Sequence, residues 1–261
     1  PHNPYDPTTI DIMDAEMPPA WAAAGNRNFL LGTDEMGRDM FSTMLYGMRI
    51  SLIIGLGAVF LQALIGIVIG LLSGYIRRLD NILMRIADVQ LSFSTYMIAI
   101  FIGAIFQTAF GVANYEKIAA PLLILIIGLA EWPQYARTVR AQVLAERRKE
   151  YVEAARVIGL SKLRIMWRHI LPNTLSPVLV ISTVQVANAI MSEAALSFLG
   201  LGMPLTKPSL GSLITAGFEY IFSGSWWITM LPGILLVLLI LVINLLGDWL
   251  RDYLNPKLYK G

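Results

Sequence analysis

The sequence contains no cysteine and only two histidines, His2 and His169. The absence of cysteine excludes disulfide bonds, thiolate metal sites and cysteine nucleophiles, and two histidines are too few for a histidine metal cluster. Charged residues are scarce as well, at 15% of the chain, whereas soluble domains carry roughly 25%. These shortages exclude several familiar catalytic centres and indicate a chain that does not depend on a charged, water-facing surface.

A second group of absences concerns ligands. The net charge of +2 is too small to indicate binding to nucleic acid. The twelve methionines do not cluster at the spacing of metal ligands, and dispersed methionines are ordinary packing residues of apolar helices. We therefore predict no catalytic, cofactor-binding or metal-binding residue in this chain, and no nucleic-acid partner.

Hydrophobic residues are abundant, making up 56% of the chain, and the mean hydropathy is +0.62. A helix needs about 20 apolar residues to cross the hydrocarbon core, where its backbone must satisfy its own hydrogen bonds. The sequence thus predicts an all-α integral membrane protein, a polytopic helical bundle with five spans within residues 50–250. The five predicted spans are Ile50–Ile76, Val89–Tyr115, Ile118–Ala136, Pro172–Leu199 and Tyr220–Gly247.

The distribution of basic residues predicts the orientation of these spans. Fifteen of the 20 lysines and arginines fall in one set of connections and five in the other. Because the more basic side faces the cytoplasm, residues 1–49 are predicted to lie outside the membrane and residues 251–261 to form a cytoplasmic tail. No signal peptide is visible before the polar external segment, so we expect a sixth span upstream of Pro1.

The connection at about 137–171 is long and too charged to enter lipid. Residues 150–158 are predicted to form a helix that ends at Gly159, and Ser161 is predicted to cap a second short helix. The residues alone fit two roles, a docking element for a cytoplasmic partner and an amphipathic helix on anionic lipid. The second helix is predicted to carry an apolar stripe opposite its basic residues, formed by Leu163, Met166, Trp167, Ile170 and Leu171.

Two short motifs in this connection are Glu153-Ala154-Ala155-x-x-x-Gly159 and Arg168-His169-Ile170-Leu171-Pro172-Asn173. Together they resemble the E-A-A loop of ATP-binding-cassette importer permeases, which implies a coupling helix that docks in a groove of an ATPase subunit. His169 departs from the general pattern, which often has an aliphatic residue there, although the second motif looks like the peptide-carrying branch. The coupling residues that the resemblance implies are Glu153, Ala154, Ala155, Gly159, Leu160, Arg168, His169 and Pro172.

The resemblance extends from Leu31 to the C-terminus through three further stretches. They are similar to the second permease of dipeptide and oligopeptide importers, a branch that also includes nickel importers. This implies the six-span fold of a type I importer permease in a bacterial or archaeal cell membrane, forming half of a translocation pathway. The stretches are Leu31-Gly32-Thr33-Asp34-x-x-Gly37-Arg38-Asp39 with Gly47-x-Arg49-x-Ser51-Leu52, Ser197-Phe198-Leu199-Gly200-Leu201-Gly202, and Gly247-Asp248-x-x-Arg251-Asp252-x-Leu254-x-Pro256-Lys257-Leu258.

The resemblance also implies partners. These are a homologous permease that completes a heterodimer, two ATPase subunits and an external solute-binding protein. The chain has no G-x-x-x-x-G-K-[ST] phosphate-binding loop, so ATP and magnesium are expected on the ATPase subunits and this chain is not expected to be an enzyme. The substrate stays open among dipeptides, longer peptides, glutathione-like compounds and chelated nickel.

Polar residues inside spans are candidates for a translocation pathway, because burying them in lipid is costly. Gln185, Asn188 and Ser192 share one face of the fourth predicted span, and Glu193 follows directly. The alternative is a set of interhelical hydrogen bonds that holds the bundle together. Glu193 also lies near the outer end of the span, where it could reach water or contact the binding protein.

The principal alternative from another class is a secondary transporter or channel. Such a protein predicts inverted repeats and paired charges inside the membrane. The sequence shows no convincing internal repeat, and only Glu131 and Glu193 are charged within the predicted spans, apart from their ends. Glu131 is expected to form an ion pair with Arg137, less than two helical turns away.

Overall fold

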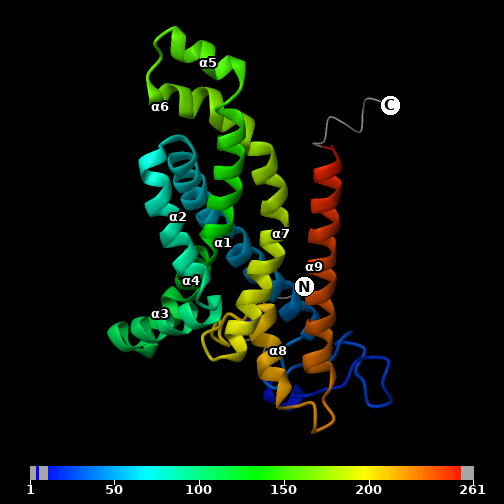
Figure 1. Ribbon diagram of the computed structural model, residues 1–261. Coiled ribbons are helices and arrows are strands. Elements are labelled where there is room, and N and C mark those ends of the chain that lie inside the picture. The colour runs from blue at the N-terminus through cyan, green and yellow to red at the C-terminus, as the bar shows by residue number, and fades with distance from the viewer. Residues whose placement is uncertain (1–3, 6–10, 254–261) are drawn as a thin grey trace. The chain divides into compact units, whose positions relative to one another are not determined.

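The computed structural model describes residues 4–5 and 11–253, and within them it is all-helical (Figure 1). The pairing of strands in this part of the chain is limited to one isolated antiparallel bridge between Thr33 and Asp39. The predicted fold class is therefore confirmed. The elements are η1 (Ile12–Asp14), α1 (Met40–Tyr75), α2 (Arg77–Leu91), α3 (Thr95–Phe110), α4 (Val112–Glu146), α5 (Glu150–Val157), α6 (Lys162–Arg164), the π-helical η2 (Ile165–Ile170), α7 (Leu171–Phe198), α8 (Leu210–Phe218) and α9 (Trp227–Tyr253).

Four helical segments are long and apolar enough to cross a membrane. The pair α2 and α3 passes the same test as a unit but is bent by 87°, so the described chain has four or five candidate spans. This number agrees with the five predicted spans. The four segments are Met40–Tyr75, Ile118–Glu146, Lys162–Phe198 and Trp227–Tyr253.

The second predicted span, Val89–Tyr115, is wrong as a single straight helix. The helix α2 ends at Leu91, and α3 begins at Thr95. At the break, the hydroxyl of Ser92 donates to the carbonyl of Asp88 at 2.9 Å. Serine side chains that bond to the backbone favour helix ends, and the sequence Ser-Phe-Ser interrupts an otherwise apolar run. Hydropathy registers the apolar run and misses the bend.

Helix ends also differ from the predicted boundaries. The first span begins at Met40, well before Ile50, because Asp39 caps it by accepting a hydrogen bond from the Ser42 amide at 3.0 Å. The span that includes Pro133 continues to Glu146 instead of ending at Ala136. Most of the predicted tail, residues 254–261, lies outside the described residues.

The chain divides into two compact units. Unit 1 comprises Pro1–Gly55, Ile102–Leu123 and Ala189–Val242, and unit 2 comprises Leu56–Phe101, Ile124–Asn188 and Ile243–Gly261. In unit 1, the segment before α1 is fastened to α9 because the Trp227 indole donates to the Thr33 carbonyl at 3.1 Å. This bond adjoins a buried apolar cluster of Met40, Met44, Trp227 and Ile228.

In unit 2, the second half of α1 packs directly against α4. Gly66, Gly70 and Gly74 repeat every four residues, so they share one face of α1. A Cβ atom at Gly70 would lie 2.6 Å from the Ala136 carbonyl oxygen, and one at Gly66 would lie 2.2 Å from the Tyr135 Cβ. Small residues let helix backbones approach closely in membranes, which is why this face carries glycine.

Polar contacts in unit 2 correct the ion pair expected for Glu131. Arg137 pairs with Asp88 of α2 instead, and Arg140 forms a two-pronged ion pair with Asp80, with Nη2 2.7 Å from Oδ2. Glu131 accepts a hydrogen bond from the Gln62 side chain at 3.4 Å. Arg137 and Arg140 therefore fasten α4 to α2.

Candidate functional sites

The connection between α4 and α7 folds as a helical hairpin beyond the ends of these two helices (Figure 1). Its turn is a Schellman motif: the Leu160 amide donates to the Ala155 carbonyl at 3.1 Å, and the Gly159 amide donates to the Arg156 carbonyl at 3.0 Å. Gly159 has a φ of +83°, a left-handed conformation that glycine adopts without strain. Ser161 caps the second helix by accepting from the Arg164 amide. The predicted turn and cap are thus present.

The residues of the E-A-A pattern divide between two faces of the hairpin. Glu153, Ala154 and Gly159 are exposed, whereas Ala155 is buried against the hairpin interior. A side chain larger than alanine at 155 would therefore disturb the hairpin itself, whereas one at 154 would extend away from the hairpin interior. Of the remaining predicted coupling residues, Arg168 and Pro172 are exposed, and Leu160 and His169 are partly buried.

The residues of the apolar stripe predicted for the second helix divide between two environments. Met166 and Ile170 are buried within the chain, whereas Leu163 and Trp167 are 64% and 49% exposed. The prediction assumed an α-helix, whereas residues 165–170 form a π-helix, whose wider turn changes which residues share a face.

Leu163 and Trp167 join two further exposed apolar side chains on the hairpin. Val157 is 88% exposed and Ile158 is 77% exposed, and both immediately precede Gly159. We call Val157, Ile158, Leu163 and Trp167 the hairpin apolar face. Exposed apolar side chains gathered on one short hairpin make it a candidate interaction surface.

Tyr151 joins the hairpin to both neighbouring helices, a role that the sequence reasoning missed. Its hydroxyl donates to the Glu146 carboxylate at the end of α4 at 2.6 Å, and it accepts from the Asn173 amide of α7 at 3.3 Å. Burial, followed by the Glu146 carboxylate, raises the pKa of Tyr151 to about 12, so the hydroxyl stays protonated. A tyrosine five residues after a glutamate in a loop is too common a pattern to have indicated this contact.

The hairpin is also connected to α1. Arg147, just after α4, donates to the Gly74 carbonyl at 2.9 Å, and the Arg156 guanidinium lies over the Tyr75 ring at 5.8 Å. Together with Tyr151, these contacts connect the hairpin to the ends of three membrane helices in unit 2. A displacement of the hairpin would therefore be transmitted to α1, α4 and α7.

The polar residues of α7 fall into two different environments. In unit 2, the Asn188 amide donates to the Gln185 side-chain oxygen at 2.7 Å, and Asn188 is exposed. Gln185 is buried, and its Nε2 atom has no hydrogen-bond partner among the described residues. This pair is therefore incompletely satisfied in the isolated chain. Ser192, farther along the helix in unit 1, is buried.

Glu193 lies in unit 1 and is fully buried, which argues against one of the roles left open for it, that of a residue reaching water. Its carboxylate accepts hydrogen bonds from Ser209 at 2.6 Å, Ser197 at 2.9 Å and Ser51 at 3.5 Å. Ser51 belongs to α1, Ser197 to α7, and Ser209 caps α8. The three serines and Glu193, which we call the serine niche, therefore join three helices through one carboxylate.

Among the described residues, no group of three or more histidine, cysteine, aspartate or glutamate side chains is placed to hold a metal ion. The candidate functional features described above are the hairpin apolar face, the polar residues of α7 and the serine niche.

Comparison with solved structures shows that chains of ABC transporters share this helical fold. The chain matches a subunit of the MetNI methionine ABC transporter in inward-facing conformations with a TM-score of 0.66 and 20% identity, over 83% of this chain and 97% of that chain. An amino acid ABC transporter crystallised with histidines matches with a TM-score of 0.59 and 15% identity. At these identities the likeness concerns the fold alone.

Comparison of sequences shows the family of the chain as well as its fold. The family described as binding-protein-dependent transport system inner membrane component matches residues 63–260. The chain is 39% identical over 256 residues to the di/tripeptide transport system permease protein DppC of Pseudomonas aeruginosa (strain UCBPP-PA14), covering 98% of this chain and 81% of that protein. It is likewise 39% identical to the dipeptide transport system permease protein DppC of Escherichia coli (strain K12), covering 98% and 82%. The chain therefore belongs to the family of inner membrane components of binding-protein-dependent transport systems.

Proposed function

We propose that this permease is one half of the membrane pathway of an ATP-driven importer of dipeptides and short oligopeptides. A homologous permease supplies the other half, two ATPase subunits bind ATP and magnesium, and an external binding protein delivers the peptide. Residues before Met40 lie outside the membrane, and the α5–α6 hairpin lies in the cytoplasm, in keeping with the distribution of basic residues. The family and the peptide-permease relatives support this proposal.

The observation that carries the coupling role is the hairpin apolar face. Four large apolar side chains are exposed around a left-handed glycine: Val157 and Ile158 precede the candidate span Lys162–Phe198, and Leu163 and Trp167 lie at its start. A groove of an ATPase subunit would bury them. Closure of the ATPases on ATP would then displace the hairpin and, through Tyr151 and Arg147, the ends of α1, α4 and α7. The two states of the pathway would be exchanged by this differential stabilisation.

We also propose roles for the polar residues of α7. The incompletely satisfied pair of Gln185 and Asn188 fits a surface that meets the solute or the second permease, and Ser192 continues the same helix face. Glu193 fits the structural alternative, because every hydrogen bond in the serine niche comes from its own unit.

The experiment is co-purification of the complete importer from its native membrane in mild detergent. Gly159→Asp and Glu153→Lys are expected to reduce the retained ATPase at least about tenfold, equivalent to about 1.4 kcal/mol, and to abolish uptake without changing membrane insertion. The matched control is Gly224→Asp, since Gly224 also has a positive φ, of +100°, and open space around it, but belongs to an external loop.

Two outcomes would contradict the proposal. If Gly159→Asp retained as much ATPase as Gly224→Asp, the hairpin would not be the docking element. If the wild-type protein transported solute with no ATPase present, a secondary transporter would be the better interpretation. The substrate class is tested in proteoliposomes, where unlabelled dipeptide should compete for uptake of a labelled dipeptide and glutathione or a nickel chelate should not.

A further inference from the structure

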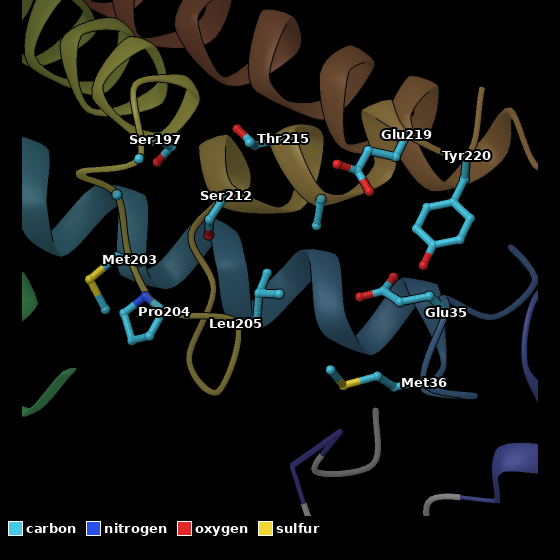
Figure 2. A pocket seen from close by; sticks show the side chains of 13 residues that line it. Glu35, Met36, Ser197, Met203, Pro204, Leu205, Ser212, Thr215, Glu219 and Tyr220 are labelled. Atoms are coloured by element: carbon cyan, nitrogen blue, oxygen red, sulfur yellow. The ribbon is translucent and has the colours of Figure 1, made fainter. Parts of the chain in front are cut away.

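Unit 1 contains a cavity of about 640 Å³ (Figure 2). Its walls come from the segment before α1, the connection after α7 and helix α8, which precedes α9. The proposed orientation places these segments outside the membrane. The cavity is lined by Glu35, Met36, Ser197, Gly200, Gly202, Met203, Pro204, Leu205, Ser212, Thr215, Ala216, Glu219 and Tyr220. We call it the external pocket.

One end of the external pocket is acidic. The carboxylates of Glu35 and Glu219 and the hydroxyl of Tyr220 gather there, as Figure 2 shows. The nearest cation to Glu35 is Arg38, whose Nη2 atom is 3.8 Å from the carboxylate and too distant for a hydrogen bond. Arg38 is engaged more closely by Asp34, at 2.6 Å from Nε. Glu219 makes no ion pair within the described part of the chain.

The charge at this end is therefore not balanced by the chain itself. The Glu35 side chain is only 15% exposed, and burial together with the neighbouring Asp34 carboxylate raises its pKa above the ordinary value. A carboxylate that is poorly hydrated and poorly paired is stabilised by any cation that enters the pocket. The acidic end of the pocket therefore lacks a closely paired cation.

The rest of the pocket is apolar. Met36, Met203, Pro204 and Leu205 line it beside the acidic end. Lysine and arginine side chains have this same division, with an apolar stem and a charged end, and they bury the stem along apolar surface. The cavity suits such a side chain better than it suits a bare metal ion, which would need several oxygen ligands around one point.

The segments around the pocket carry net charge of the same sign, although Asp34 and Arg38 among them are buried and paired with each other. Residues 11–39 and 199–226 contain seven acidic residues and three basic ones: Asp11, Asp14, Glu16, Asp34, Glu35, Asp39 and Glu219 against Arg27, Arg38 and Lys207. An acidic face of this kind attracts a partner with a basic patch and increases the rate of encounter. The external partner of this family is a binding protein.

We propose that the external pocket receives a lysine or arginine side chain of the solute-binding protein and thereby anchors that protein to this permease. The inference rests on the proposed function for the presence of the binding protein. The cation pairs with Glu35 and Glu219, the Tyr220 hydroxyl bonds to it, and its stem packs against the apolar wall. The pocket is formed by segments that flank the spans, which is where a docking protein makes contact.

The test measures binding of the purified, dipeptide-loaded binding protein of the same import system to the complete transporter in nanodiscs. The double variant Glu35→Gln and Glu219→Gln is expected to raise Kd about tenfold or more and to reduce the dependence of Kd on salt. The matched control Asp14→Asn, which changes an external charge outside the pocket, is expected to change Kd less than about twofold. Tyr220→Phe provides a smaller second perturbation, and thermal unfolding of each variant checks the fold.

Each result is decisive. If the double variant binds as tightly as Asp14→Asn, the inference is overturned and the proposed function stands. If binding is unchanged while KM for peptide uptake rises, the pocket holds the ammonium group of the peptide and the inference is again overturned. If the wild-type transporter binds no binding protein at all, the proposed function and this inference fall together.

Discussion

The hairpin apolar face and the serine niche differ in how their key side chains are exposed: apolar side chains are exposed in the first, and a carboxylate is buried in the second. The hairpin leaves Val157 and Ile158 almost fully exposed beyond the membrane helices. The niche buries a carboxylate completely and supplies hydroxyl donors to it from within the same unit. The hairpin therefore leaves apolar surface uncovered in the isolated chain, whereas the serine niche satisfies its buried carboxylate within the chain.

We propose that this difference separates residues that act through partners from residues that hold the fold. Exposed apolar surface costs free energy until something covers it, so it persists where a partner is available. A buried carboxylate persists where its hydrogen bonds are satisfied locally. A polar side chain inside a membrane span is therefore a weaker sign of function than a buried polar atom that lacks a hydrogen-bond partner. Gln185, which bonds to Asn188, has such an atom, and the carboxylate of Glu193 does not.

The largest expected effect is on the serine niche. Glu193→Ala removes the acceptor shared by three serines and leaves their hydroxyls buried without it, so we expect the free energy of unfolding to fall by about 3 kcal/mol. Thermal unfolding in detergent measures this loss. Glu193→Gln keeps one acceptor oxygen and should lose less than half as much. Unchanged stability with lost uptake would instead make Glu193 a pathway residue.

The next effect is on the hairpin apolar face. Leu163→Asp places a charge where we expect an apolar contact with the ATPase, and Kd for the ATPase should rise at least about tenfold. Unfolding should change by less than about 0.5 kcal/mol because the side chain is exposed. The matched control is Phe222→Asp, since Phe222 is 88% exposed in an external connection. Equal ATPase binding by the two variants would refute the docking surface.

A smaller effect is expected where the hairpin joins the membrane helices. Tyr151→Phe removes the hydroxyl that bonds to Glu146 and Asn173, at a cost of about 1 kcal/mol. Because the hairpin apolar face is untouched, the ATPase should still co-purify, while peptide transported per ATP hydrolysed should fall about threefold. Tyr253→Phe, at the exposed end of α9, serves as the control. An unchanged ratio would show that Tyr151 does not transmit the motion.

The smallest effect on stability is expected at Asn188. Asn188→Ala removes an exposed amide, so unfolding should change by less than about 0.5 kcal/mol. If Asn188 lines the pathway, KM for dipeptide uptake should change about two- to threefold. Asn81→Ala, in the exposed part of α2, should leave KM unchanged. Identical KM values for both variants would remove Asn188 from the proposed pathway.

Several features could be predicted from the sequence because they depend on local chemistry. Apolar runs longer than a bilayer is thick predicted the membrane helices, since the backbone must be satisfied internally there. Gly159 and Ser161 predicted the end of one helix and the start of the next, because a left-handed residue and an N-cap hydroxyl act within a few residues. These predictions agree with the structure.

Other features required the tertiary structure. The bend between α2 and α3 falls inside an apolar run, where hydropathy has no signal. Glu131 bonds to Gln62 and Arg137 to Asp88, because residues distant in sequence came closer than the expected neighbour. The external pocket likewise joins Glu35 to Glu219 across most of the chain length.

The sequence by itself determined the membrane class, the family and the hairpin, because apolar length, capping residues and the E-A-A pattern are each written in consecutive residues. Only the tertiary structure decided which polar side chains have all their hydrogen-bond partners and which do not. Glu193 and Asn188 are five residues apart on one helix, and their sequence contexts are equally polar. Their environments differ because Ser51 and Ser209, far away in the chain, reach one and not the other.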